Sequence, residues 1–326
     1  MLSRVAESIF WMSRHIERAE NIGRLIDVNI RLTLDVPMDI KLQWEPIINI
    51  TGDKDLFFSK NDVADQDNVI DFLVFNRSYA NSIITCVNNA RENARSVRAV
   101  IPIEMWQCIN EFYLFLVAPI ATGEAISSPN SFFSKVKNYS QLFVGIAETI
   151  MPHDEGWHFL RIGRLLERSD KTSRILDVKY FIVLPRVDYV GSAYDNIHWA
   201  ALLRSASALD MYRKHFHGTT PANILAFLFF DPDFPRSIKH CLRVCDASLH
   251  EISGTPMSGY ANDAERRLGI LRSEIEYSDV SDIMQCGLHE YIDSFQEKLN
   301  NVGNAISDTF FTAQPPTSMS IRKIYR

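Results

Sequence analysis

The chain has 326 residues, of which 46% are hydrophobic and 23% are charged, and its formal net charge is -6 at pH 7. This is the composition of an ordinary globular protein with enough apolar material for a sizeable core. The acidic balance argues against nucleic acid as the main partner. No uninterrupted apolar run approaches the roughly 20 residues of a membrane-spanning helix.

Cysteine usage and the N-terminal charges indicate the compartment. The five cysteines form no Cys-x-x-Cys pair, which fits a reducing environment. Glu7, Glu17 and Glu20 interrupt any signal-peptide pattern at the N-terminus. We therefore expect a cytoplasmic protein that does not enter a membrane.

In the first half of the chain the sequence predicts helices almost throughout. The expected helices span residues 2–31, 41–50, 77–100, 104–117 and 131–150, with a polar loop at 51–65. The apolar run VIDFLVF has the composition of a strand, but its helical neighbours favour a helix. Pro37 and Pro102 follow the ends of the two longest predicted helices, where proline commonly stands.

The second half has a parallel pattern after a short link at residues 151–156. The expected helices span residues 157–183, 198–215, 222–230, 236–252, 264–277 and 281–308. A loop with Pro185 and Gly191 separates the first two of them. The last residues, from 314 onward, should form a poorly ordered tail.

Two long stretches share one pattern at a shift of 150 positions. Residues 9–30 read IFWMSRHIERAENIGRLIDVNI, and residues 159–180 read FLRIGRLLERSDKTSRILDVKY. The dipeptide Glu17-Arg18 thereby returns as Glu167-Arg168. Other charged residues that match in this way are Glu20 with Asp170, Arg24 with Arg174, and Asp27 with Asp177. Order, spacing and residue type agree over too long a run for coincidence.

Further matches at a shift of 155 extend the repeat. Residues 69–76, VIDFLVFN, return at 224–231 as ILAFLFFD, and Trp44 returns as Trp199. We interpret the chain as a tandem duplication of a unit of roughly 150 residues, which is a usual size for a domain.

The predicted fold is therefore all-α, a tandemly duplicated helical bundle with pseudo-twofold related halves. The halves would span residues 1–153 and 154–313, and a flexible tail would span 314–326. Because the first helix of each half is apolar on both sides of its charged stripe, the halves should pack as one continuous bundle.

The repeated helix places its charges on one narrow stripe. At about 100° per residue, Glu17, Glu20 and Arg24 share that stripe, and the second half repeats it. The stripe could be a buried charge network that fixes how the halves dock. The alternative is a site that grips a polar ligand between them. The candidate residues are Glu17, Arg18, Glu20 and Arg24, with Glu167, Arg168, Asp170 and Arg174.

A second charged cluster belongs to the first half alone. Arg91, Arg95 and Arg98 recur at helical spacing, so they could bind a carboxylate or a phosphate. Their counterparts at a shift of 155 are Asp246, His250 and Ser253, which do not keep the charge. Loss in one half suggests a function specific to the other, although a solvated helix face would look the same. Glu92 and Glu104 complete this candidate set.

Signatures of cofactors and metals are weak. The chain has no Gly-rich phosphate loop of the usual spacing, so we expect no nucleotide cofactor. Glu155-Gly-Trp-His158 has the Glu-x-x-His spacing of di-iron bundles, but such a site needs the motif on two helices. The nearest second candidate, Asp195-Asn-Ile-His198, crosses a loop-to-helix boundary, so we expect no metal.

Three segments resemble the bacterial alpha-E domain family, an all-helical family. They are MLSRVAESIFWMSRHIERAENIGRLIDV, WHFLRIGRLLERSDKTSRILDV and ENARSVRAVIPIEMWQCINEFY, and the similarity covers essentially the whole chain. The resemblance implies association with circularly permuted ATP-grasp proteins and transglutaminase-like proteases, in systems that make or modify peptides through amide bonds. The resemblance places the family's polar motifs on the following residues: Glu17, Arg18, Glu20, Asn21, Arg24, Glu92, Asn93, Arg95, Ser96, Arg98, Glu104 and Trp106 in the first half, and Glu167, Arg168 and Asp170 in the second.

Two hypotheses about function follow. In the first, the chain is a non-catalytic scaffold or substrate-presenting subunit of an ATP-grasp amide ligase and does not itself use ATP. In the second, it is an enzyme acting on a peptide-like or carboxylate substrate. Glu17 or Glu167 would then be the acid or base, with a pKa raised by partial burial, and Arg95 and Arg98 would be anchors.

Overall fold

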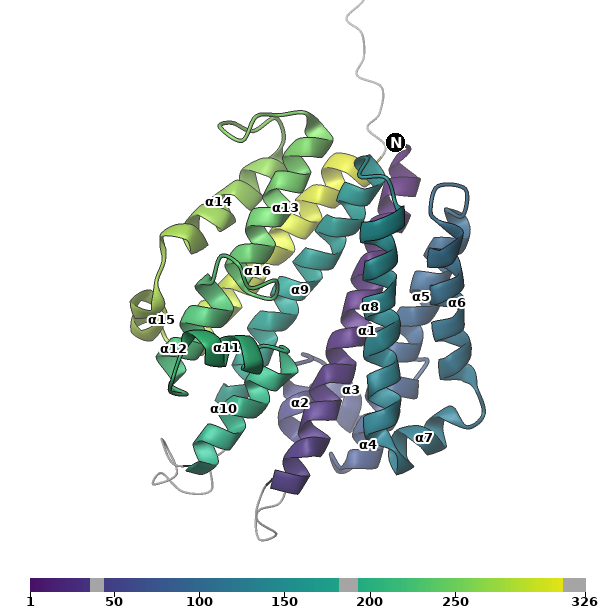
Figure 1. Ribbon diagram of the computed structural model, residues 1–326, viewed down its shortest axis with the longest axis vertical. Coiled ribbons are helices and arrows are strands. Elements are labelled where there is room, and N and C mark those ends of the chain that lie inside the picture. The colour runs from purple at the N-terminus through teal and green to yellow at the C-terminus, as the bar shows by residue number, and fades with distance from the viewer. Residues whose placement is uncertain (36–43, 182–192, 313–326) are drawn as a thin grey trace, which may run out of the picture.

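The computed structural model describes residues 1–35, 44–181 and 193–312, and every regular element in these ranges is a helix (Figure 1). This confirms the all-α prediction. The predicted tail at 314–326 and most of the predicted loop at 184–195 lie outside the described residues.

Two long parallel helices form the centre of the molecule. They are α1 (Ser3–Asp35) and α9 (Glu155–Phe181), and they run side by side in the same direction (Figure 1). Neither contains proline, and apolar residues surround the charged stripe of each. A helix of this kind is buried over much of its circumference, so each can pack against the other and against a bundle of its own.

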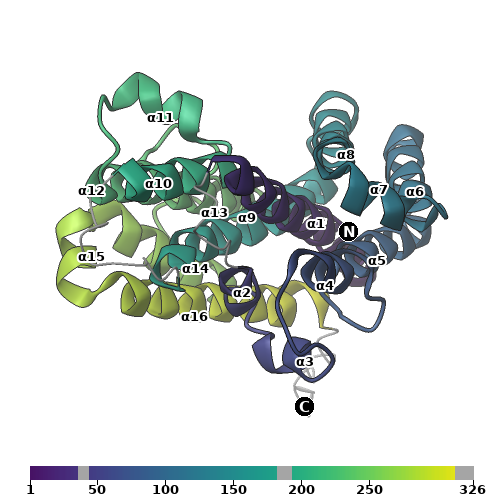
Figure 2. The ribbon, with the colours of Figure 1, turned by 90° about the horizontal axis from the view of Figure 1, so that it is seen from below.

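Each central helix packs against two further long helices, and a third long helix packs against those two. Helix α1 contacts α5 (Ile83–Ser96) and α8 (Pro129–Ile150), and α6 (Ile103–Val117) packs on both of these. Helix α9 contacts α13 (Ile238–Ser253) and α16 (Leu288–Ile306), and α14 (Asp263–Tyr277) packs on both of these. Seen along the bundle, the two groups flank the central pair (Figure 2).

Short helices connect the long ones, and two of them cross to the other half. These two are α2 (Glu45–Asn49), which packs on α9, and α10 (Ala193–Ser205), which packs on α1. Other short helices are α3 (Lys54–Phe58), α7 (Ala121–Ser127), α11 (Leu209–His215) and α15 (Val280–Cys286). The apolar core runs without a break across the predicted boundary at residue 153, and the ring of Phe311 lies 5.3 Å from that of Phe10 and 5.7 Å from that of Phe159.

Both copies of the repeated apolar run are helical, as their neighbours suggested. Each copy is a short α-helix that widens into a π-helical turn: α4 (Gln66–Ile70) with η1 (Asp71–Phe75), and α12 (Pro221–Leu225) with η3 (Ala226–Phe230). A third π-helical turn, η4 (Ser307–Phe311), ends α16. The bounds of the first two pairs, and the starts of α5 and α13, differ by the same 155 positions. Duplication itself remains our interpretation of this match.

Three predicted helices differ in the structure: one begins later than predicted, and two are each divided into two helices. The helix expected at 77–100 begins only at α5, because the hydroxyl of Ser82 caps the amide of Thr85 at 3.3 Å. The helix expected at 281–308 is divided into α15 and α16 at Gly287, whose φ of 97° lies in a region that favours glycine. The helix expected at 198–215 is divided into α10 and α11 around Ser207.

In the described part of the chain, no single helix combines the length and apolar character needed to cross a membrane. Helices α6 and α7 would meet that test only if taken together, and they are bent by 76° relative to one another.

Candidate functional site

The two Glu-Arg dipeptides pair reciprocally where α1 and α9 meet. Glu17 accepts hydrogen bonds from Nε and Nη2 of Arg168, at 2.9 and 2.8 Å. Glu167 accepts hydrogen bonds from Nε and Nη2 of Arg18, at 2.6 and 2.9 Å. Because the helices are parallel and carry the dipeptide at the same height, each glutamate faces the arginine of the other helix. Both pairs are bidentate, the strongest geometry for an arginine and a carboxylate.

Each central carboxylate also receives further polar contacts that differ between the halves. Glu17 accepts from Nη1 of Arg236 at 3.1 Å and from the side-chain amide of Asn21 at 2.9 Å. Glu167 instead lies 3.0 Å from the Arg14 guanidinium and 3.4 Å from Nζ of Lys171.

The matched positions of the two repeats carry different residues here. Lys171 stands where Asn21 stands in the other repeat, and Asn81 stands where Arg236 does. The amide oxygen of Asn81 accepts from Nη1 of Arg18 at 2.7 Å. Each glutamate therefore has a cation beyond its partner arginine, but from different elements: Arg236 in a loop serves Glu17, whereas Arg14 in α1 and Lys171 in α9 serve Glu167.

The environment of the central glutamates keeps them ionised. Glu17 is 2% exposed and Glu167 is 0% exposed. Burial alone would raise their pKa values, but the charges of Arg168 and Arg236 hold the pKa of Glu17 well below its usual range. Arg18 and Lys171 do the same for the pKa of Glu167. The expectation of a raised pKa at these glutamates is therefore wrong, because the surrounding guanidinium groups outweigh desolvation.

The outer acidic residues of the stripes pair within their own helices. Glu20 accepts from Nε of Arg24 at 2.9 Å, and Asp170 accepts from Nε of Arg174 at 3.0 Å. Glu20 also accepts from Nη2 of Arg236 at 2.8 Å. The eight predicted stripe residues thus form two ion-pair networks, one around Glu17 and one around Glu167. In the second network Lys171 joins Asp170 to Glu167.

An open cavity of about 310 Å³ ends against the network around Glu17. Its wall combines charged residues from α1 and α9 with side chains of α8 and of two loops. The lining residues are Glu20, Arg24, Gln141, Val144, Arg168, Ser207, Phe234, Pro235 and Arg236. Arg24 reaches the hydroxyl of Ser207, to which its Nη1 donates a hydrogen bond. This cavity is a candidate ligand site because buried charged side chains form part of its wall.

Sequence reasoning missed Arg236 and Ser207 as members of the site. Both lie in loops of the second half, and Arg236 is 219 positions from Glu17 in the chain. One signal was present, since Arg236 directly precedes Ser237, a residue that matches Ser82 in the repeat. A charged residue at that position in only one half marks a place where the halves differ.

The first-half cluster lies apart from the Glu-Arg pairs. Arg95 is exposed and pairs with Glu92 at 2.6 Å. The Arg98 guanidinium stacks 4.8 Å from the ring centre of Trp106, and Glu104 is exposed. No described contact connects this cluster with Glu17 or Glu167, so the structure does not assemble the predicted base and its predicted anchors into one site.

The second-half counterparts form a cluster of a different kind. Asp246 is 1% exposed and lies 2.8 Å from Nε of Arg272 and 3.7 Å from Nε2 of His250. Burial raises the pKa of Asp246, against the opposing charge of Arg272. At these positions the second half instead has an ion pair between α13 and α14.

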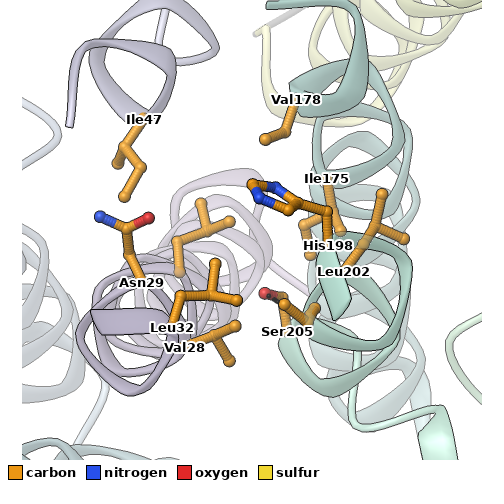
Figure 3. A pocket seen from close by; sticks show the side chains of 11 residues that line it. Val28, Asn29, Leu32, Ile47, Ile175, Val178, His198, Leu202 and Ser205 are labelled. Carbon is orange, nitrogen blue, oxygen red and sulfur yellow. Dashed lines mark hydrogen bonds between the residues drawn. The ribbon is translucent and has the colours of Figure 1, made fainter. Parts of the chain in front are cut away.

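A second, smaller cavity lies between α1, α2, α9 and α10 (Figure 3). Its volume is about 50 Å³, and its wall is mainly apolar, with Asn29, His198 and Ser205 as the polar side chains. The side-chain nitrogen of Asn29 is buried there without a hydrogen-bond partner. A space of this size holds a few water molecules and no substrate.

One group of possible metal ligands occurs among the described residues. Single ligand atoms of Asp177, His289 and Asp293 lie within 4.8 Å of one another. A hydrogen bond of 2.8 Å between His289 Nδ1 and Asp177 already accounts for most of this proximity. Glu155, from the Glu-x-x-His motif, lies elsewhere and pairs with the N-terminal amine.

Several known proteins are similar to this chain. Proteins of Mycobacterium bovis and of two Mycobacterium tuberculosis strains, all described as uncharacterised, are 22% identical to the chain over 329 residues. The match covers 94% of this chain and 36% of each relative. No solved structure matches.

The family model that matches residues 1–311 is Alpha-E, described as a predicted alpha-helical domain with a conserved ER motif. The Glu17-Arg18 and Glu167-Arg168 dipeptides fit that description. The chain therefore belongs to the Alpha-E family.

Proposed function

We propose that this chain is a non-catalytic helical subunit that acts as a scaffold or substrate-presenting partner of an ATP-grasp amide ligase. The ligase would make or modify peptides in the cytoplasm, and this chain would not itself use ATP. The ligase partnership comes from the family resemblance, and the non-catalytic role comes from the central glutamates.

The observation that carries the non-catalytic role is the state of Glu17 and Glu167. A general acid or base works best when its pKa lies near the operating pH. The pKa values of both carboxylates lie far below neutral pH, and their oxygens already accept guanidinium hydrogen bonds. Groups held in this way join two helices and are poorly suited to moving protons.

The curated relatives add a second line of support. This chain corresponds to only 36% of each mycobacterial relative. In each relative the matching region is therefore joined covalently to a longer stretch of further chain. The same association between separate chains is what the proposed subunit role requires.

The test is a deletion and a pull-down in the native cell. A tagged copy should co-purify with an ATP-grasp protein in stoichiometric amount, and deletion of this chain should lower the ligase's product. Normal ligase activity in the deletion strain, together with the absence of a complex, would contradict the proposal.

A turnover assay distinguishes the subunit from an enzyme. The purified chain alone should not convert peptide-like or carboxylate substrates. If it did so, and if Glu17→Gln abolished the reaction while the helical circular dichroism was unchanged, the enzyme hypothesis would replace the proposed one.

A further inference from the structure

The 310 Å³ cavity described above contains more positive than negative charge. The guanidinium groups of Arg24, Arg168 and Arg236 meet there, and the two carboxylates they contact are Glu17 and Glu20. Arg24 is 6% exposed and Arg236 is 8% exposed, so water cannot fully compensate the surplus. An unmatched charge in such a place is destabilising unless an anion pairs with it.

The pKa of Arg236 is consistent with this surplus of positive charge. Burial lowers its pKa, and the neighbouring charge of Arg168 lowers it further, against the pull of Glu20 and Glu17. An arginine destabilised by another arginine indicates a positive potential at this wall, which would favour an anion.

Ser207 provides a second, independent indication. Its φ is 50°, and it is the only non-glycine residue with a positive φ in the described part of the chain. At the matched position, 155 residues earlier, the chain has Gly52 with a φ of 78°. Glycine adopts this conformation at little cost, whereas serine does not. A strained serine that lines a cavity is typical of a functional position.

The hydroxyl of Ser207 has the chemistry that an anion needs. It accepts a hydrogen bond from Arg24, so its own hydrogen remains available for a ligand oxygen. The cavity is also lined by Pro235 and Val144, which offer an apolar wall beside the charged one.

We propose that this cavity binds a monocarboxylate: its oxygens would contact Arg24, Arg168, Arg236 and Ser207, and its apolar part would lie against Pro235 and Val144. One surplus charge matches one carboxylate. Glu20, the only acid among the described residues that line the cavity, disfavours a dianion such as phosphate. The inference does not depend on the ligase partnership.

Calorimetric titration of the full chain tests the site. The probes are N-acetylphenylalanine, which resembles a peptide C-terminus, and hydrocinnamate, a simple acid of similar size. N-acetylphenylalanine amide is the uncharged control, and phenyl phosphate is the dianion control. At least one of the acids should bind about tenfold or more tightly than the amide and the phosphate. The acid that binds more tightly identifies the source of the carboxylate.

Two variants locate the binding. Arg236→Asn introduces the residue found at the matched position 81, and it should weaken binding of the acid about tenfold. Ser207→Gly removes the hydroxyl from a conformation that suits glycine, so it should weaken binding without loss of thermal stability. Arg243→Gln, on the exposed face of α13, is the control and should bind normally.

Other outcomes would contradict binding of a monocarboxylate in this cavity. Failure of both acids to bind in the millimolar range, equal binding of acid and amide, or unchanged affinity in the stably folded Ser207→Gly and Arg236→Asn proteins would each overturn the proposal. Tighter binding of phenyl phosphate would overturn the assignment to a monocarboxylate.

Discussion

At the scale of single residues, the central glutamates show how burial and charge compete. Glu17 and Glu167 are almost completely excluded from water, which favours a neutral carboxyl group. Several guanidinium groups within hydrogen-bonding distance reverse that preference. Replacing such a pair by apolar residues can be neutral, but removing one partner leaves a buried charge without compensation.

Glu167→Gln should therefore lower the free energy of unfolding by about 3–5 kcal/mol, because Arg14 and Arg18 would remain near the centre without their carboxylate. The matched control is Glu274→Gln. Its partner Lys298 lies 2.7 Å away, but both side chains are more than 40% exposed, so the loss should stay below about 1 kcal/mol. Urea unfolding followed by circular dichroism measures both. Similar small losses would show that the central pairs contribute little.

His15 should control the upper part of the acid-unfolding profile. Burial, followed by the charge of Arg18, lowers its pKa from 6.5 to about 4, although Glu167 opposes this. Between these values the unfolded chain binds a proton that the folded chain does not. Stability should therefore fall as the pH falls from 6.5 towards 4, by up to about 1.4 kcal/mol per pH unit.

The matched position in the second repeat suggests the test variant. His15→Leu introduces the residue found at Leu165 and removes this titration. Unfolding free energies measured across the pH range should show a shallower slope above pH 4 for the variant than for the parent chain. The acidic limb below the ordinary glutamate pKa should remain, because Glu17 and Glu167 still bind protons on unfolding. Parallel profiles would contradict the assignment.

At the scale of elements, the contact between α1 and α9 depends on a very close approach of the two helices. A Cβ atom added at Gly163 would lie 2.4 Å from the carbonyl oxygen of Phe10 and 2.5 Å from the hydroxyl of Ser13. The absence of a side chain at this position lets the two backbones meet. One turn further along, the helices bring their Glu-Arg dipeptides into register.

Gly163→Ala should therefore destabilise the fold by about 1–3 kcal/mol, since overpacking forces the backbones apart. Gly145→Ala is the matched control, because Gly145 lies in α8 with no atom within 4 Å of its added Cβ. That change should stabilise the chain by about 0.5–1 kcal/mol through helix propensity. Thermal melts of the two variants would shift in opposite directions, and a shift in the same direction would contradict the close-packing argument.

The same scale shows what the sequence could predict. Periodicity and the internal match identified the long helices and the stripe of Glu17, Glu20 and Arg24, because these depend on spacing within one segment. The start of α5 after Ser82 and the break at Gly287 were not predicted. A serine cap or a glycine marks a helix end only where the backbone leaves the helical conformation, and the local sequence pattern does not show where that happens. Arg236 joins the stripe through a contact between segments distant in the chain, which local patterns do not encode.

At the scale of the whole molecule, the two halves depend on each other. Each central glutamate takes its partner arginine from the opposite half, and α2 and α10 each pack on the opposite central helix. A half separated from the other would expose the apolar faces of its central helix and leave its glutamate without the partner arginine. Because the halves depend on each other in this way, the intact molecule should unfold as a single cooperative unit.

Cleavage of the link between the halves tests this. A protease site inserted after the exposed His153 should allow cutting without dissociation. The cut chain should elute as one species of unchanged size. Its calorimetric transition should remain single, with equal calorimetric and van't Hoff enthalpies. Two fragments that elute apart, or two resolved transitions, would show that the halves are independent domains.

The reciprocal pairing of the dipeptides has a further consequence. A helix that presents Glu-Arg at this height is complementary to a parallel copy of itself, which is the geometry of an isologous dimer interface. In a dimer of two identical chains, every substitution would occur on both sides of the interface. Within a single polypeptide the two sides can differ, and they do: Asn21 and Arg236 surround one glutamate, whereas Lys171 lies beside the other, whose partner arginine bonds Asn81. Covalent linkage thus permits a self-complementary contact to carry the proposed carboxylate site on one of its two sides.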